Sequence, residues 1–171
     1  MKLYTENQFI EALSRGQYDF SDSEFVGQIN ATNLQNVDFS ALPRLIFDRC
    51  NLGSDFSLGR FNNQKASLSM VGAISSGRVS LFHLHLYQLN LSTIEVSKWL
   101  AIMHCETEIL CLAGAKLPGG FITKGSRGGR LDLTGCNSGQ SLFTPESWRT
   151  VEVDDALLGK LEPTRLGELT E

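Results

Sequence analysis

Large apolar residues recur in this chain at intervals of five residues. The runs with this spacing are Phe20 and Phe25, Leu34 and Phe39, Phe47 and Leu52, Phe56 and Phe61, then Ile74, Val79, Leu84, Leu89 and Ile94, and finally Leu112, Leu117 and Ile122. This step fits neither the 3.6-residue period of a helix nor the two-residue period of a strand. A chain that turns a corner every five residues closes a coil in four such units, with each large apolar residue pointing to the axis. Successive coils would stack about 4.8 Å apart, as strands do, so the spacing predicts a β-solenoid.

A coil of four five-residue units also predicts which residues stack on one another. Leu91, Cys111 and Leu131 are separated by 20 residues at each step, and all three are apolar. Ile74 and Ile94 are separated by the same 20 residues. We therefore expect residues one coil apart in this sense to lie above one another in the core.

A short unit accompanies this spacing between residues 18 and 61. Each copy is one residue, then Asp, Asn or Glu, then Phe or Leu: Tyr18-Asp19-Phe20, Ser23-Glu24-Phe25, Thr32-Asn33-Leu34, Val37-Asp38-Phe39, Cys50-Asn51-Leu52 and Ser54-Asp55-Phe56. The unit resembles that of the pentapeptide-repeat proteins. The resemblance implies a right-handed quadrilateral β-helix, and it is clearest over residues 18–61 and degenerate from 62 to 143. Where the register slips, as between Phe39 and Phe47, we expect bulges or loops.

A leucine-rich-repeat solenoid is the alternative fold. The segment 42–52 fits that pattern, with Phe47 at a leucine position and Cys50 at the Asn/Cys position. Leu110 and Leu131 have an acceptable repeat spacing, and residues 93–104 could supply an intervening helix. The five-residue interpretation explains more consecutive intervals. In either solenoid, each unit packs only on its neighbours.

The two ends of the chain are expected to cap the solenoid. Thr5 and Gln8 form a capping-box pattern, and Gly16 stands where a helix ends, which predicts a helix over 5–15. Thr144-Pro145 is a helix start, followed by an apolar tail. The sequence thus divides into an N-terminal helical cap (1–17), a β-solenoid (18–143) and a C-terminal helical cap or tail (144–171). A homodimer contact through the tail is the alternative role of that segment.

Composition restricts the class of protein. Of the 171 residues, 42% are hydrophobic and 20% charged, which suits one folded domain, and the net charge of −4 disfavours a nucleic-acid binder. No secretory signal and no membrane-spanning run is visible, and the four cysteines form no CxxC pair. We expect a cytoplasmic protein with reduced thiols that does not bind membranes. This test does not detect a non-classical secretion signal.

Residue types that bind metals or catalyse reactions are present, but their spacing does not match that of a metal site or a catalytic site. His83 and His85 share a strand face, and His104 with Cys105 could extend them to a zinc site, but no second closely spaced ligand pair follows. No spacing places a base beside a nucleophile, and the acidic residues are explained by the repeat. We therefore expect no catalytic residues, no metal and no cofactor, and a protein that is not an enzyme.

The densest positive cluster lies in a glycine-rich stretch, 119–130, and its surroundings. Its members are Lys116, Lys124, Arg127 and Arg130. The stretch lacks the spacing of a phosphate-binding P-loop, and the glycines suggest a mobile loop or tight turns. The two interpretations are a plain loop and a basic loop that binds an acidic partner.

The functional expectation is a non-enzymatic module that presents its solenoid surface to a protein partner or acts as a scaffold. One alternative, drawn from the pentapeptide-repeat resemblance, is a DNA-mimicking modulator of the topoisomerase gyrase. A second is a bacterial secreted effector or a fragment of one. Mimicry needs a long negative surface, whereas residues 1–143 contain 12 acidic and 12 basic side chains, so 12 − 12 leaves no net charge. The charge distribution therefore argues against the gyrase alternative.

Overall fold

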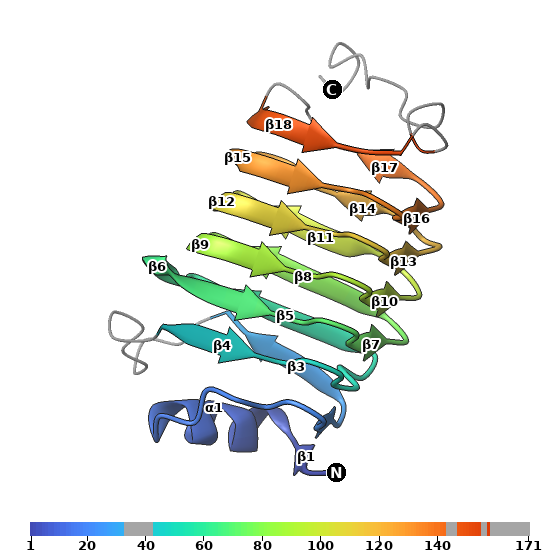
Figure 1. Ribbon diagram of the computed structural model, residues 1–171. Helices are drawn as coiled ribbons and strands as arrows, with labels where there is room; N and C mark the ends of the chain where they lie inside the picture. The colour runs from blue at the N-terminus through green and yellow to red at the C-terminus, as the bar shows by residue number, and fades with distance from the viewer. Residues whose placement is uncertain (33–42, 143–146, 155–156, 158–171) are drawn as a thin grey trace, which may run out of the picture.

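The computed structural model describes residues 1–32, 43–142, 147–154 and 157. Its strands are parallel and coil around one axis, so that each turn of chain lies directly above the previous one (Figure 1). The expectation of an all-β solenoid is therefore confirmed. Leu52, Leu84 and Leu89, which the five-residue step places in the core, are buried. Leu34 and Phe39 lie outside the described residues.

Three sheets run along the sides of the coil. The first contains β7 (Ile74–Ser75), β10 (Glu95–Val96), β13 (Lys116–Leu117) and β16 (Asn137–Ser138). The second contains β3 (Gln28–Ala31), β5 (Asp55–Gly59), β8 (Arg78–Phe82), β11 (Leu100–Met103), β14 (Phe121–Ile122) and β17 (Ser141–Leu142). The third contains β4 (Arg44–Ile46), β6 (Asn62–Ser69), β9 (His85–Asn90), β12 (Glu106–Cys111), β15 (Arg127–Asp132) and β18 (Trp148–Glu152).

A turn in the second half of the solenoid has four pairs of inward residues. In one turn the pairs are Val79 and Leu81, Leu84 and Leu86, Leu89 and Leu91, and Ile94 and Val96, all of them buried. The next turn begins at Leu100, so the inward residues follow steps of five, five, five and then six. The third sheet bends between two of these pairs, because pairing skips Tyr87 and Glu108. The coil is therefore four-sided, and its repeat is one residue longer than four units of five.

The expected stacking is wrong by that one residue. Leu89 pairs with Leu110, and Leu110 pairs with Leu131. Equivalent positions are thus 21 residues apart, as are Glu95 and Lys116, whose side chains meet between turns. The extra residue falls between the fourth pair of one turn and the first pair of the next. Because of this residue, Phe121 points inward and Ile122 outward, although the five-residue step had placed Ile122 in the core. Ile74 is exposed for the same reason.

Glycines allow the turns to approach closely where the first sheet passes to the second. A Cβ on Gly77 would lie 1.1 Å from the carbonyl oxygen of Ser54, and one on Gly119 would lie 1.5 Å from that of Lys98. Gly139 stands in the same way over Pro118, at 2.0 Å. The glycines of this column are therefore required by the contact between turns.

The N-terminal helix closes one end of the coil (Figure 1). Helix α1 (Glu6–Ser14) begins after Thr5, whose side chain accepts from the Gln8 backbone while the Gln8 side chain accepts from the Thr5 backbone, as the capping box predicts. Its apolar side buries Phe9 and Leu13, and Gly16 has the expected positive φ of 81°. Strand β1 (Leu3–Tyr4), which the sequence did not reveal, pairs with β2 (Glu24–Phe25).

The first turns are longer than the later ones and have an aromatic interior. Gln28 pairs with Asp55, 27 residues later, and Asp55 pairs with Arg78, 23 residues later. Five buried rings contact one another in this part of the core, with centroids 5.0–6.3 Å apart: Phe9, Phe20, Phe25, Phe47 and Phe56. Larger side chains thus fill the longer turns next to the helix.

The C-terminal end differs from expectation. The helix anticipated from Thr144 is absent over residues 148–152, which form β18 and extend the third sheet, so the boundary at 143 falls inside the solenoid. Of the remainder of the expected cap, the structure describes only Ser147, Val153, Asp154 and the buried Leu157. The leucine-rich-repeat alternative is also wrong in its intervening helix, because residues 93–104 contain β10 and β11.

Candidate interaction surface

The cysteines lie in the interior or in sheet contacts. Cys50, Cys105 and Cys136 are buried, and burial raises the pKa of each thiol from 9.0 to about 11. Cys111, expected in the core, lies on the outer side of β12 close to Ser92 and Asp132. The buried thiols stay protonated at neutral pH, and a protonated thiol is a poor nucleophile.

The histidines gather at one corner of the coil. His83 and His104 are exposed, have positive φ values of 52° and 54°, and stack with their ring centroids 5.2 Å apart. His85 and Glu106 are register partners on β9 and β12 beside them. Within the described residues, no group of three His, Cys, Asp or Glu side chains is arranged to hold a metal ion.

The four predicted partner-binding cations do not form a loop. Lys116 lies on β13 in the first sheet, Arg127 and Arg130 lie on β15 in the third, and Lys124 follows β14 at the end of the second, so the four are spread around the coil. Strands and corners of the coil account for this stretch in place of a plain loop, and binding of an acidic partner by its cations stays a prediction. Three of the four pair with acids: Lys116 with Glu95 at 2.6 Å, Arg127 with Glu106 at 3.4 Å, and Arg130 with Asp132 and Glu152.

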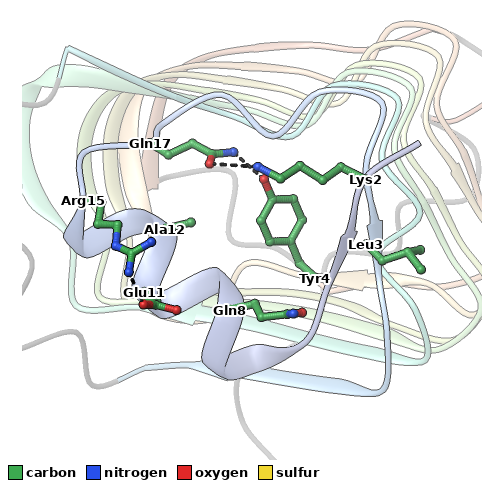
Figure 2. Close-up of a pocket in the computed structure, with 8 residues that line it drawn as sticks. All are labelled: Lys2, Leu3, Tyr4, Gln8, Glu11, Ala12, Arg15 and Gln17. Carbon is green, nitrogen blue, oxygen red and sulfur yellow. Dashed lines mark hydrogen bonds and ion pairs between the residues drawn. The ribbon is translucent and has the colours of Figure 1, made fainter.

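A shallow depression lies at the N-terminal end, between α1 and β1 (Figure 2). Gln17 donates to the Tyr4 hydroxyl and accepts from Lys2, whose ammonium stands 4.9 Å from the Tyr4 ring centroid. Glu11 and Arg15 form an ion pair at its rim. Gln17 thus joins the segment after the helix to Lys2 and to Tyr4 of the first strand, so the depression has a structural explanation.

The outer face of the second sheet changes character along the solenoid. One outward column, joined residue by residue through the strand pairing, reads Asn30, Ser57, Ser80, Ala101 and Ile122. The neighbouring column passes from Gly59 to Phe82 and Met103. Polar residues thus occupy the early turns and apolar residues the later ones.

Five outward side chains make up what we call the apolar face: Phe82, Trp99, Ala101, Met103 and Ile122. Each is partly exposed, because the residues that alternate with them fill the core. The Phe82 ring lies over Gly59 and the Trp99 ring over Gly120, where an added Cβ would come within 2.6 Å and 3.1 Å of the respective ring. The glycines therefore let both rings lie close against the backbone of a neighbouring turn.

Cations without ion-pair partners border the apolar face. Between residues 78 and 142, Arg78, Lys116, Arg127 and Arg130 each pair with an acid in the structure as described. The two remaining cations of that range, Lys98 and Lys124, are exposed, and neither forms an ion pair with a described residue.

The positions of these cations follow from the chain. Lys98 immediately precedes Trp99, and the Lys124 carbonyl accepts from the backbone of His104, one residue beyond Met103. Arg60, at the corner next to Gly59, is a third exposed cation that forms no ion pair with the described residues. The apolar face therefore has positive charge on two of its borders.

Among the residues of this surface, sequence reasoning proposed only Lys124 for binding, and it placed Ile122 in the core. The apolar face was missed because its members come from successive turns and become neighbours only through the register between those turns. Strand β11 alone, with Leu100 and Ile102 inward and Ala101 and Met103 outward, has no polar side. That pattern is a local signal of a sheet covered on both faces.

Comparison with protein-family models, with curated proteins and with solved structures finds no match for this chain. The resemblance to pentapeptide-repeat proteins therefore stays a prediction from the residues that carry it. None of the helices among the described residues has the length and apolar character that crossing a membrane requires.

Proposed function

We propose that this solenoid is a non-enzymatic interaction module that binds a protein partner through the apolar face of its second sheet. The observation that carries the proposal is the cluster of Phe82, Trp99, Ala101, Met103 and Ile122 on the outside of a parallel sheet. An outward apolar cluster with polar surroundings is typical of a protein-binding surface. Parallel sheets are ordinarily covered on both faces, and a partner would supply the second cover.

The scaffold beneath the face supports this role. Backbone hydrogen bonds between turns fix the positions of the outward residues, so little conformational entropy is lost when a partner docks. Trp99 and Phe82 would supply the aromatic anchors that dominate binding free energy in most interfaces. The buried, protonated thiols and the stacked, exposed histidines offer no comparable arrangement for catalysis among the described residues.

Paired substitutions test the surface. Ala101→Glu places a charge in the centre of the apolar face, whereas Ser57→Glu places one in the same outward column, two turns away on the polar part. Proteins captured from a bacterial lysate by the unmodified chain should be lost with Ala101→Glu and kept with Ser57→Glu. Thermal melts establish that both variants are folded, and Ile122→Ser is a milder substitute if Ala101→Glu melts early. Capture that is unaffected by Ala101→Glu and Ile122→Ser would refute the proposal.

A further inference from the structure

The charges around the apolar face indicate what kind of segment it binds. Strands β8, β11 and β14 contain no acidic residue, while Lys98, Lys124 and Arg60 stand at the border without ion-pair partners among the described residues. The acids of the same turns lie on the first and third sheets: Glu95 on β10, Glu106 and Glu108 on β12, and Asp132 on β15. Between residues 78 and 142, the unpaired lysines therefore border the apolar face, while the acids lie on the first and third sheets. The acid of the second sheet that Lys98 influences is Asp55 on β5, one turn before β8, where the backbone hydrogen bond from Arg78 and, less strongly, Lys98 lower the carboxyl pKa.

Lys98 and Lys124, unpaired among the described residues, contrast with the cations on the other sheets of the same turns, which pair with acids. On the first and third sheets, a cation of one turn lies against an acid of another turn: Lys116 pairs with Glu95 one turn away, and Arg149 with Glu108 two turns away. Between residues 78 and 142, that ladder pairs every cation of the first and third sheets, and among the described residues it continues on the second sheet only at Arg78 with Asp55. It is interrupted at the apolar face, where none of the described acids lies within ion-pair distance of Lys98 or Lys124.

Building on the proposed function, we propose that the apolar face binds an amphipathic segment of another protein. The segment carries leucine or aromatic residues on one side and Asp or Glu at its edges. These acids would be the ion-pair partners that Lys98 and Lys124 lack among the described residues. The apolar side chains would cover Ala101, Met103 and Ile122. The carboxylates would reach Lys98 on one border and Lys124 on the other. Complementary charge of this kind speeds association and selects the orientation of the bound segment.

A second copy of the chain fits the face less well. A symmetric pair places the same patch of each copy against the other, so the unpaired lysines would meet cations across the interface. Such like charges oppose association, and the apolar area of five partly exposed side chains would have to overcome them. An acidic segment removes this conflict and gains from the same lysines.

Charge reversal tests the inference separately from the proposed function. The double variant Lys98→Glu with Lys124→Glu reverses the border and leaves the apolar face intact, and Lys65→Glu, on the exposed part of β6 in the third sheet, is its matched control. Using the full chain as bait in a bacterial lysate, we expect the double variant to bind the captured partner at least tenfold more weakly in low salt, and the control to bind as before. Raising the salt concentration should narrow the difference, because it screens exposed charges.

Zero-length carbodiimide cross-linking identifies the contacting groups, because it joins a lysine amine to a carboxylate. The expected products link Lys98 or Lys124 to Asp or Glu within an amphipathic segment of the captured protein. If Ala101→Glu abolishes capture but the double lysine variant does not weaken it, the acidic partner is wrong and the proposed function stands. If Ala101→Glu has no effect, or nothing is captured, both fail.

Two other ligands of the apolar face, a part of this same chain and an anionic lipid surface, would give different experimental results. Cross-links from Lys98 or Lys124 to carboxylates of residues 158–171, or to a second copy of the chain, would overturn the partner in favour of self-docking. Sedimentation with phosphatidylserine vesicles that is lost in the double lysine variant would overturn it in favour of an anionic lipid surface.

Discussion

The early turns and the later turns of the solenoid differ in their length and in the side chains that fill their interior. In the early turns, register partners such as Gln28 and Asp55 lie 27 residues apart, and the interior is a cluster of phenylalanine rings. From residue 74 to 132, partners on neighbouring turns lie 21 residues apart, as Glu106 and Arg127 do, and leucines predominate at the inward positions. Longer turns accept large rings, whereas regular turns need side chains of similar size.

The most regular sequence motif and the most regular coil lie in different parts of the chain. The five-residue unit resembles the pentapeptide pattern most clearly over residues 18–61, yet the coil is least regular there. From residue 74 to 132 the unit is degenerate, yet partners on neighbouring turns keep a spacing of 21 residues, after the register shift between Asn63 and Ser67 on β6. What the fold requires is an apolar or small residue at each inward position, and Cys105, Ser126 or Thr107 satisfies that requirement as leucine does. Regular geometry therefore does not need a regular motif.

The largest expected effect is at the aromatic end. Phe47 contacts the rings of Phe9, Phe20 and Phe56, so Phe47→Ala should lower the free energy of unfolding by about 3–5 kcal/mol. Its outward neighbour Ile46, replaced by Ala, is the control and should cost distinctly less, because Ile46 is already partly exposed. Urea melts of both variants measure the difference. Equal costs would mean that the ring cluster does not hold the irregular turns together.

The regular turns should instead be sensitive to backbone spacing. Gly119→Ala would place a methyl group 1.5 Å from the Lys98 carbonyl oxygen, so the two turns must separate, at a cost of about 3 kcal/mol. Lys98→Ala, one turn earlier in the same column, should change stability by less than about 0.5 kcal/mol. The same melts apply. A Gly119→Ala variant as stable as the unmodified chain would show that the turns are looser than their register implies.

The buried thiols of both regions should make a smaller contribution to folding stability, which alkaline pH removes. Burial raises the pKa of Cys50, Cys105 and Cys136 to about 11, whereas in the unfolded chain each thiol ionises near 9.0. A raised folded pKa stabilises the fold below pH 9, and this stabilisation is lost as the pH rises through 11. Stability measured between pH 8 and 11 should fall less steeply in Cys105→Ala than in the unmodified chain. Parallel curves would contradict the assignment.

The smallest effect is expected at the ion pairs on the regular turns. Lys116 and Glu95 are exposed, at 65% and 43% of their side-chain surfaces, so solvent screens their 2.6 Å contact. Lys116→Ala should cost less than about 1 kcal/mol, and added salt should reduce that cost further. A double-mutant cycle with Glu95→Ala isolates the pair. A coupling free energy well above about 1 kcal/mol would indicate that the charge ladder, and not the core, keeps the regular turns in register.

Much of the architecture was accessible from the sequence. The five-residue step located the inward side chains within each turn, since Val79, Leu84, Leu89 and Ile94 are all buried. The capping box of Thr5 and Gln8 located the start of the helix, because its hydrogen bonds are local. The sequence did not reveal β18 at Trp148–Glu152, because pairing with β15 overrides the helix signal of Thr144-Pro145 there.

By itself, the sequence determined which residues point inward along a single turn, because that choice depends on spacing over a few residues. Only the tertiary structure decided how many residues complete a turn, since the sixth residue of the last step is fixed by contact with the turn below. A change of register by one residue exchanges the inner and outer faces of a strand. That single residue sets Ile122 beside Ala101 on the outside, and so creates the apolar face from residues far apart in the chain.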